Sequence, residues 1–196
     1  DRCFLVDEKG DIVNPSTLTG LIAARELSKY PESSVIYNLI SSRSVAEIVN
    51  ENGGTAIRSR VGHSYIKKLM ADTGAIFGGE HSGHFYFRDF WCADSGMLAA
   101  LHAVAALGTQ SSPLSKILKK YQRYFASGAI NSAVTDPASV LAQIESLYEN
   151  KDGVTFDYLD GLTVSADGWW FNMRPSNTEP LLRLNVEAKT RARLER

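Results

Sequence analysis

Hydrophobic residues in the first half of the chain alternate between runs typical of strands and spacings typical of helices. Short apolar runs that predict strands occur at residues 3–7, 35–40, 56–61, 75–77 and 85–87. Apolar residues with the helical period lie between them, in residues 17–29, 45–49 and 65–70. Because strands and helices alternate over residues 11–107, the pattern predicts an α/β domain with a largely parallel sheet and possible mixed pairing at its edge.

The longest apolar stretch comes next in the chain. It covers residues 97–107, is interrupted by His102, and predicts a buried helix that begins after Asp94 or Ser95. A further helix is expected over residues 114–124. No apolar run approaches the roughly 20 residues that a membrane-spanning helix needs, so we expect no membrane partner.

The pattern changes in the last third of the chain. A strand is predicted at residues 129–134 and a helix at residues 138–148, with Asp136-Pro137 at the helix start. The dipeptides Asp160-Gly161 and Asp167-Gly168 favour hairpin turns. These turns separate the last predicted strands, at residues 154–156, 162–164, 169–171 and 181–186.

The whole pattern predicts an α/β fold class with two domains. We expect a three-layer α/β/α domain with a mixed sheet over residues 12–123, followed by a smaller α+β domain with an antiparallel sheet over residues 124–196. The chain opens at an apolar run without an initiator Met. We therefore expect it to be a piece of a longer polypeptide.

Composition and charge exclude several classes of protein. The chain is 44% hydrophobic and 22% charged, as in ordinary globular proteins. Its net charge of −1 gives no general attraction to nucleic acid, which is not an expected partner. Cys3 and Cys92 lie far apart, which fits neither a disulfide framework nor a zinc pattern. A reducing compartment, and so a cytoplasmic location, is the expectation.

A glycine-rich polar segment, residues 78–84, separates two of the predicted strands. It combines three glycines with Glu80, Ser82, His81 and His84. Glycine lets the backbone approach a ligand closely, carboxylate and hydroxyl groups bind sugar hydroxyls, and histidine transfers protons near neutral pH. A sugar-binding loop is the functional interpretation, and a polar hairpin with incidental histidines is the alternative.

A second polar segment, residues 174–180, lies between two strands of the last third. Arg174 offers a bidentate donor for phosphate, and Ser176, Asn177 and Thr178 add neutral donors. Successive backbone N–H groups in such a turn form an anion-binding nest. An ordinary turn between strands is the alternative.

Both segments resemble motifs of the α-D-phosphohexomutase family of phosphomannomutases and phosphoglucomutases. Residues 79–84 match the family's sugar loop, G-E-x-S-G-H, and residues 174–180 match its phosphate loop, R-x-S-N-T-x-P. The resemblance implies that Glu80 and Ser82 bind sugar hydroxyls and that His84 lies close to the reacting centre. It also implies that the nonreacting phosphate is gripped by Arg174, Ser176, Asn177 and Thr178.

Two further matches extend the resemblance toward the start of the chain. Residues 62–67 are similar to the family segment T-G-H-S-x-I-K, which implies that His63 joins His84 in the active cleft. Asp1-Arg2 resembles the end of the metal loop D-G-D-x-D-R, which makes residues 1–11 the tail of a metal-loop domain. Arg2 would face the transferring phosphoryl group. Asp1 would be one of three carboxylates on Mg²⁺, so the site is expected to be incomplete here.

The resemblance implies a function for the full-length protein. It would interconvert hexose 1-phosphate and hexose 6-phosphate, of mannose or glucose, through a phosphoserine and a bisphosphorylated hexose. The family's phosphoserine segment, T-A-S-H-N-P, is absent from these 196 residues. We therefore expect this chain to supply sugar and phosphate recognition, to need N-terminal domains of the same polypeptide as partners, and to be inactive alone.

Other classes of function stay open at this point. A non-catalytic module that binds sugar phosphates would explain the same two loops. A phosphatase or kinase-like protein is disfavoured because no P-loop and no nucleophile with an adjacent base is found in the sequence. A purely structural interaction domain would not explain the composition of the two polar loops.

Overall fold

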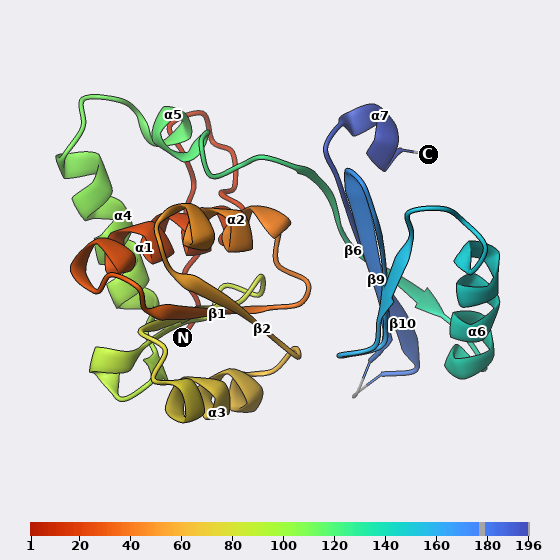
Figure 1. Cartoon of the computed structure of the whole chain (residues 1–196). Helices are drawn as coiled ribbons and strands as arrows, with labels where there is room; N and C mark the ends of the chain where they lie inside the picture. Colours follow the sequence, from red (N-terminus) through yellow and green to blue (C-terminus); the bar gives the residue numbers. More distant parts are fainter. Residues whose placement is uncertain (177–178, 196) are drawn as a thin grey trace. The chain divides into compact units, whose positions relative to one another are not determined.

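The chain of this computed structural model divides after Arg123 into two units, which are described separately. Unit 1 is Asp1–Arg123 and unit 2 is Tyr124–Arg196 (Figure 1). The structure describes residues 1–176 and 179–195.

Unit 1 is built on a mixed sheet of five short strands in the order β2-β1-β3-β4-β5. The first three in this order pair in parallel, and β4 and β5 are antiparallel additions. The parallel part follows from the strand–helix alternation in the sequence, because a helical crossover returns the chain to the same end of the sheet. The strands are β1 (Ser34–Asn38), β2 (Thr55–Ser59), β3 (Phe77–Gly79), β4 (Phe85–Phe87) and β5 (Ala93–Asp94).

Helices cover both faces of this sheet. Helices α1 and α2 lie on one face and α3 lies on the other (Figure 1). The helices of unit 1 are α1 (Pro15–Lys29), α2 (Arg43–Glu51), α3 (His63–Thr73), the 3-10 turn η1 (Arg88–Phe90), α4 (Gly96–Gly108) and α5 (Leu114–Leu118). The predicted three-layer α/β/α domain with a mixed sheet is therefore confirmed.

Local sequence signals define where these helices begin and end. The Asn14 side chain caps α1 by accepting from the Ser16 backbone N–H, and Pro15 supplies a first residue that needs no hydrogen bond. Gly74 ends α3 in the left-handed conformation at φ 68°, which glycine adopts without steric cost. The first helix was predicted over residues 17–29, so α1 begins two residues earlier than expected.

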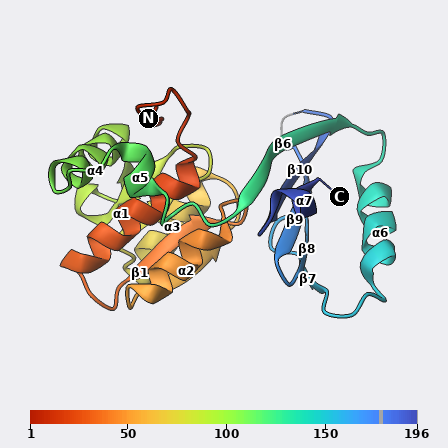
Figure 2. The same ribbon diagram turned by 90° about the horizontal axis from the view of Figure 1, so that it is seen from above.

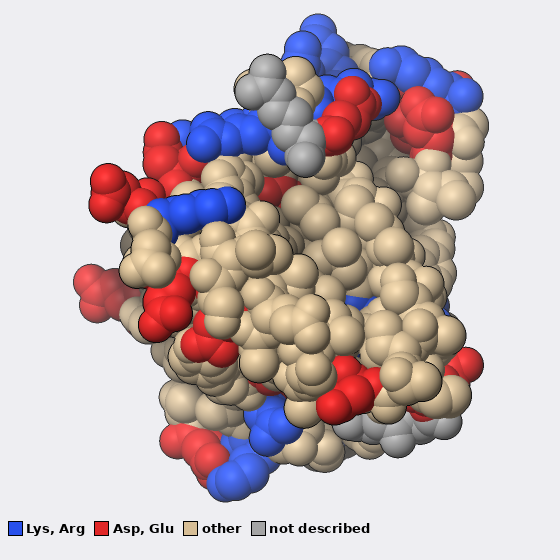
Figure 3. Space-filling view, turned by 90° about the vertical axis from the view of Figure 1, so that its right-hand side faces the viewer, with Lys and Arg blue, Asp and Glu red and all other residues tan. Residues whose placement is uncertain are grey.

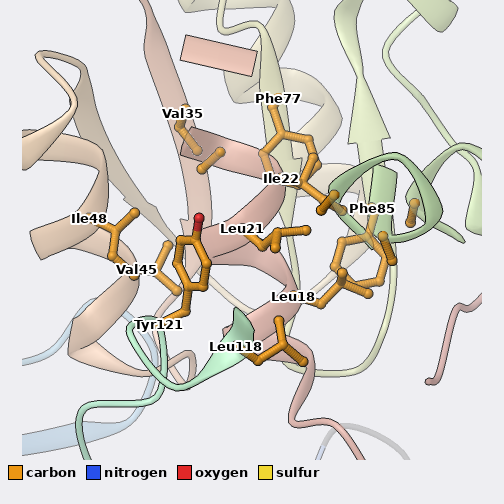
Figure 4. Close-up of a cluster of buried hydrophobic side chains, with 14 of the residues drawn as sticks. Leu18, Leu21, Ile22, Val35, Val45, Ile48, Phe77, Phe85, Leu118 and Tyr121 are labelled. Atoms are coloured by element: carbon orange, nitrogen blue, oxygen red, sulfur yellow. The ribbon is translucent and has the colours of Figure 1, made fainter. Parts of the chain in front are cut away.

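The core of unit 1 lies between α1, α2 and the sheet (Figure 4). Burying each large side chain of this kind stabilises the fold by roughly 1.5–3 kcal/mol, so this cluster supplies much of the stability of unit 1. Its labelled members are Leu18, Leu21, Ile22, Val35, Val45, Ile48, Phe77, Phe85, Leu118 and Tyr121.

Two predicted elements at the edges of unit 1 are wrong. Residues 3–7 do not form a strand, because the Asp7 side chain accepts from the backbone N–H groups of Lys9 and Asp11 and turns the chain back locally. Only an isolated bridge between Val6 and Ile12 results. The helix predicted over residues 114–124 ends at Leu118.

Helix α4 differs from the buried helix that its composition predicts. Only its alanines Ala99, Ala103 and Ala106 are buried. Met97 is 76% exposed and Val104 62% exposed. Helix α4 packs against α1, and Leu98 and Leu107 lie partly buried against the same core, whereas Leu101 is exposed like Met97 and Val104. The described residues contain no helix of the length and apolar character required to cross a membrane.

Unit 2 is an antiparallel sheet of five strands in the order β6-β10-β9-β8-β7 (Figure 2). The long helix α6 runs beside this sheet. The elements are β6 (Phe125–Ala133), α6 (Pro137–Tyr148), β7 (Thr155–Asp157), β8 (Leu162–Ala166), β9 (Trp169–Pro175), β10 (Leu181–Ala188) and α7 (Arg191–Leu194). The predicted antiparallel α+β domain is confirmed.

Aromatic and aliphatic side chains join α6 to the sheet of unit 2. The Tyr148 ring contacts both Trp169 and Phe171, with ring centroids 5.7 and 5.4 Å away. A groove of about 800 Å³ remains between α6, the sheet and α7, lined by apolar residues such as Met173 and Leu184. The face of unit 2 around α6 is largely uncharged at its centre (Figure 3). None of the predicted sugar or phosphate ligands that the structure describes lines this groove.

Candidate functional site

The predicted site residues of unit 1 gather at the carboxyl ends of its parallel strands. Asn38 ends β1 and Gly79 ends β3, while α3 begins at His63 shortly after β2. Since β2, β1 and β3 are parallel, these three positions share one edge of the sheet. Ligands of open α/β sheets bind at this edge.

The glycine-rich loop leaves β3 at a point of close packing with α1. A Cβ atom at Gly79 would lie 2.4 Å from Cγ2 of the buried Thr19. A side chain at this position would push α1 away from the sheet. Gly79 therefore allows the loop to begin next to the helix, which fixes where Glu80 stands.

Glu80 is buried to 3% exposure, although the sequence assigns it to ligand binding. Its Oε1 accepts a hydrogen bond of 2.5 Å from the Tyr86 hydroxyl, and its Oε2 accepts from Asn38 Nδ2 and Ser82 Oγ at 3.4 Å each. Burial, followed by the bond to Glu80, raises the pKa of Tyr86, so its hydroxyl is a donor throughout the physiological range. An ionised carboxylate has about four acceptor positions, which leaves one for a sugar hydroxyl.

Asn38 is held by its own partners. Its Oδ1 accepts from Ser41 Oγ at 2.7 Å and from the His81 backbone N–H at 3.4 Å, so its Nδ2 points toward Glu80. Sequence analysis assigned no role to Asn38 or Tyr86. Two sequence signals could have identified them: a polar residue at the carboxyl end of a parallel strand, and a tyrosine in an apolar strand.

His81 lies on the other side of the same loop. Its Nδ1 lies 2.9 Å from Ser16 Oγ, and that hydroxyl also accepts from the Ser42 backbone N–H at 3.1 Å. Ser16 therefore donates to Nδ1, which fits a neutral imidazole. Burial lowers the pKa of His81, as expected for a group whose charged form has lost its water.

The lowered pKa of His81 predicts an acid-sensitive unit 1. Below about pH 6.5 the unfolded chain binds a proton at this histidine that the folded chain excludes, so stability falls as the pH decreases through this window. The His81→Gln variant should lose less stability between pH 7 and 5, by at most about 1.4 kcal/mol per pH unit. Hydrogen exchange of buried α1 amides measures this. An unchanged pH dependence in His81→Gln would contradict it, and His63→Gln, at an exposed histidine, is the control.

His84 is held from both ring nitrogens. Its Nδ1 lies 3.0 Å from Asp94 Oδ2, and Arg2 Nε donates to its Nε2 at 3.2 Å. The Cys3 backbone N–H donates to Gly83 O at 2.9 Å and fixes the chain start against the loop. Of the predicted residues, Arg2, Glu80, Ser82 and His84 therefore lie together in unit 1.

Asp94 is a member of this cluster that the sequence did not identify as functional. Besides His84, it contacts the amino nitrogen of Asp1 at 2.6 Å and Lys67 Nζ at 3.8 Å. The hydrogen bond from Asp1 and the one from His84 hold the pKa of Asp94 well below its usual range. Asp94 was considered only as a helix cap, and Ser95 takes that role.

His63 occupies the first position of α3, where its side chain is exposed. Lys67 stands one helical turn later on the same face of α3 and reaches Asp94. The start of α3 therefore faces the His84–Asp94 pair, and a helix N-terminus favours a nearby anion.

Asp1 does not complete a metal site in the described part of the chain. No group of three or more His, Cys, Asp and Glu side chains is placed there to hold a metal ion. The neighbouring Asp94 carboxylate is bonded to His84. Because Mg²⁺ prefers several oxygen ligands, the residues present do not fit this ion.

The predicted phosphate site lies in unit 2 and centres on Arg174 in β9. This arginine is only 8% exposed, and its Nε has no hydrogen-bond partner among the described residues. Burial lowers the pKa of Arg174, and Asp160 partly opposes this effect. A buried guanidinium N–H without a partner destabilises the fold unless an anion binds there.

Gly161 brings the β7–β8 turn directly onto Arg174. A Cβ atom at Gly161 would lie 2.3 Å from Met173 O and 2.6 Å from Arg174 Cβ. The residue also has φ 71°, which side chains rarely adopt. The turn thus packs against the backbone of β9 at the position of the arginine.

The loop after Arg174 returns tightly to the sheet. The Ser176 backbone N–H donates to Leu181 O at 2.8 Å. Arg183, opposite Arg174 in the β9–β10 register, bonds Glu179 at 3.0 Å. The predicted phosphate ligands Asn177 and Thr178 lie outside the described residues.

Two family models match adjoining parts of this chain. Residues 14–124 match the model described as phosphoglucomutase/phosphomannomutase, alpha/beta/alpha domain III. Residues 130–196 match the model described as phosphoglucomutase/phosphomannomutase, C-terminal domain. The first match covers most of unit 1 and the second covers most of unit 2.

Curated relatives are similar to the chain over nearly its whole length. A phosphomannomutase of Methanocaldococcus jannaschii is 40% identical over 188 residues, which are 96% of this chain and 41% of the relative. A phosphomannomutase of Salmonella typhimurium is 39% identical over 190 residues, with the same two shares. The chain thus spans about 41% of the length of these relatives.

Solved structures give the same likeness. A phosphoglucomutase/phosphomannomutase family protein from Burkholderia thailandensis has a TM-score of 0.86 at 28% identity, and the match covers 99% of this chain and 42% of that one. Parafusin from Paramecium, a phosphoglucomutase, has a TM-score of 0.74 at 18% identity, covering 96% of this chain and 38% of that one. The second likeness shows the fold alone.

Proposed function

This chain belongs to the phosphoglucomutase/phosphomannomutase family, and we propose on that premise that the whole protein is a cytoplasmic hexose-phosphate mutase. It would interconvert the 1-phosphate and 6-phosphate of mannose or glucose. Unit 1 would recognise the sugar, and unit 2 would recognise the phosphate. The remaining domains of the same polypeptide would carry the phosphoserine, so this chain alone would not turn over.

The observation that carries this proposal is the buried Glu80 carboxylate at the carboxyl edge of the sheet. Three donors orient it, from Tyr86, Asn38 and Ser82, and an acceptor position remains. Such a fixed acceptor suits a hydroxyl of a hexose. Glu80 and Ser82 would contact hydroxyls that are presented in both orientations of the sugar.

The phosphate that is not reacting would bind in unit 2. Arg174 supplies a buried cation whose Nε lacks a described partner, and Ser176, Asn177 and Thr178 would add donors. A phosphate oxygen at Arg174 would supply an acceptor that the residues described in the structure do not provide.

The reaction would run in two phosphoryl transfers. An oxygen–phosphorus bond forms at a sugar hydroxyl as the serine oxygen–phosphorus bond breaks, which gives the bisphosphorylated hexose. After reorientation the other phosphate returns to the serine. His63 and His84 would act on the protons of the sugar hydroxyls, and Arg2 would face the moving phosphoryl group. Mg²⁺, if used, would need carboxylates other than Asp1.

A second candidate function is a non-catalytic module that binds sugar phosphates. Each unit offers a buried polar side chain for such binding, Glu80 in unit 1 and Arg174 in unit 2. The two proposals predict the same binding and differ in turnover. Adding the remaining domains distinguishes them, because only a mutase fragment would contribute to catalysis.

Calorimetric titration of the purified chain with glucose 1-phosphate and mannose 1-phosphate tests the sugar site. We expect Glu80→Gln to weaken binding about 10- to 100-fold, since a hydrogen bond to a charged group is worth about 1.5–3 kcal/mol. The matched control is Asp89→Asn, which changes an exposed carboxylate of unit 1 that bonds Tyr30 and Arg88. Equal affinity in Glu80→Gln and the unchanged chain would refute the assignment of Glu80.

A further inference from the structure

We propose that Asp94 is a positioning residue that holds His84 in the Nδ1–H tautomer, so that His84 Nε2 faces the site as a hydrogen-bond acceptor. The hydrogen-bond part of this proposal stands on the structure of unit 1 alone. Its meaning for catalysis rests on the mutase function proposed above.

The partners of the two ring nitrogens determine the tautomer. Asp94 Oδ2, 3.0 Å from Nδ1, belongs to an ionised carboxylate, which only accepts hydrogen bonds. Arg2 Nε, 3.2 Å from Nε2, belongs to a guanidinium, which only donates. A neutral ring with its proton on Nδ1 is the state that satisfies both contacts at once.

The other protonation states leave one contact unfavourable. An Nε2–H tautomer would turn a lone pair toward the Asp94 carboxylate and an N–H toward the Arg2 guanidinium. A doubly protonated ring would satisfy Asp94 but would place two donors and two positive charges together at Arg2. Each mismatch loses a hydrogen bond to a charged group, which is stronger than a neutral one.

The surroundings of Asp94 favour its role as an acceptor. Lys67 Nζ approaches Oδ1 at 3.8 Å from α3, and the amino nitrogen of Asp1 contacts Oδ2 at 2.6 Å. Lys67 therefore places a positive charge beside the carboxylate oxygen that does not face the ring. Its place in β5, paired with Tyr86 of β4, fixes it next to His84 of the adjoining loop.

The tautomer gives His84 a defined chemical role. Without substrate, Arg2 occupies the Nε2 lone pair. When Arg2 turns to a phosphoryl group, a hexose hydroxyl takes its place at Nε2. The hydroxyl proton then moves to Nε2 as its oxygen bonds to phosphorus, and the Asp94 carboxylate stabilises the imidazolium that forms. His84 would therefore act as the base toward the hydroxyl that attacks.

Nitrogen NMR of the 15N-labelled chain tests the tautomer directly. The chain has four histidines, and the His84 signals are assigned as those that disappear in His84→Gln. At about pH 8, above the ordinary histidine pKa, we expect a protonated Nδ1 and an unprotonated Nε2 for His84. In Asp94→Ala the fraction of the Nδ1–H form should fall, because neutral histidine in water favours Nε2–H and only Arg2 then opposes that form.

The control is Asp89→Ala, which removes an exposed carboxylate near the same strands and should leave the His84 signals unchanged. An Nε2–H ring in the unchanged chain overturns the proposal, even if Asp94→Ala fails to fold. An undiminished fraction of the Nδ1–H form in folded Asp94→Ala also overturns it. Sugar-phosphate titration is a separate measurement, so failure of the mutase proposal would leave the tautomer result intact.

Discussion

Replacing Gly161 with alanine is expected to unfold unit 2 or to lower its melting temperature by about 8–40 °C. The new Cβ atom would lie 2.3 Å from Met173 O, an atom fixed by the β9 ladder. The left-handed backbone adds about 1–2 kcal/mol and the clash about 1–3 kcal/mol. Each kcal/mol shifts the melting temperature of a domain of this size by about 4–8 °C.

Gly168→Ala is the matched control for this experiment. Gly168 has φ 77°, close to the 71° of Gly161, but its Cβ would meet only flexible side chains at 3.3 Å or more. The difference between the two variants therefore isolates the steric clash. Fluorescence of Trp169 and Trp170 reports unit 2, because the remaining tryptophan, Trp91, is exposed in unit 1. Equal melting temperatures for the two variants would show that the β9 backbone shifts to relieve the clash without a loss of stability.

Replacing Arg174 with methionine is expected to remove hexose-phosphate binding while the melting temperature of unit 2 stays constant or rises. The guanidinium is buried with its Nε lacking a described partner, so the folded chain gains little from its charge. Methionine keeps most of the aliphatic volume. A bound phosphate loses its bidentate partner, and affinity should fall by more than 100-fold.

Opposite changes in stability and affinity separate a ligand-binding arginine from a structural one. If Arg174 only supported the fold, methionine would lower stability, and binding would fall only as the unit unfolds. Arg191→Met, on exposed α7, is the control and should change neither quantity. Phosphate binding that survives in Arg174→Met would refute the assignment of Arg174 as the phosphate ligand.

Periodicity located most elements of the fold, because elements such as α2 and β1 have a buried face that the sequence marks. Strand β3 shows the limit of this approach. It was predicted at residues 75–77 and forms at Phe77–Gly79, since glycines that carry no hydrophobic signal pair with β1. Helix α4 shows another limit, because an apolar composition does not reveal which face a helix buries.

The site was predictable where the chain itself brings residues together. Glu80, Ser82 and His84 share one loop, so their neighbourhood follows from the sequence. Asp94 reaches His84 only because β4 and β5 pair, and Asn38 reaches Glu80 only because β1 and β3 are parallel. Such contacts depend on strand order, which residue spacing does not encode.

The strand order of unit 2 has a consequence for biosynthesis. Strand β10 lies between β6 and β9, so the sheet stays in two parts until Leu181–Ala188 has left the ribosome. All the strands of unit 1 have been made by Asp94. Until β10 has been made, β6, which is exposed along its length, presents an unpaired edge to other nascent chains. Translation of residues 125–188 is therefore the interval in which holdase chaperones have most to protect.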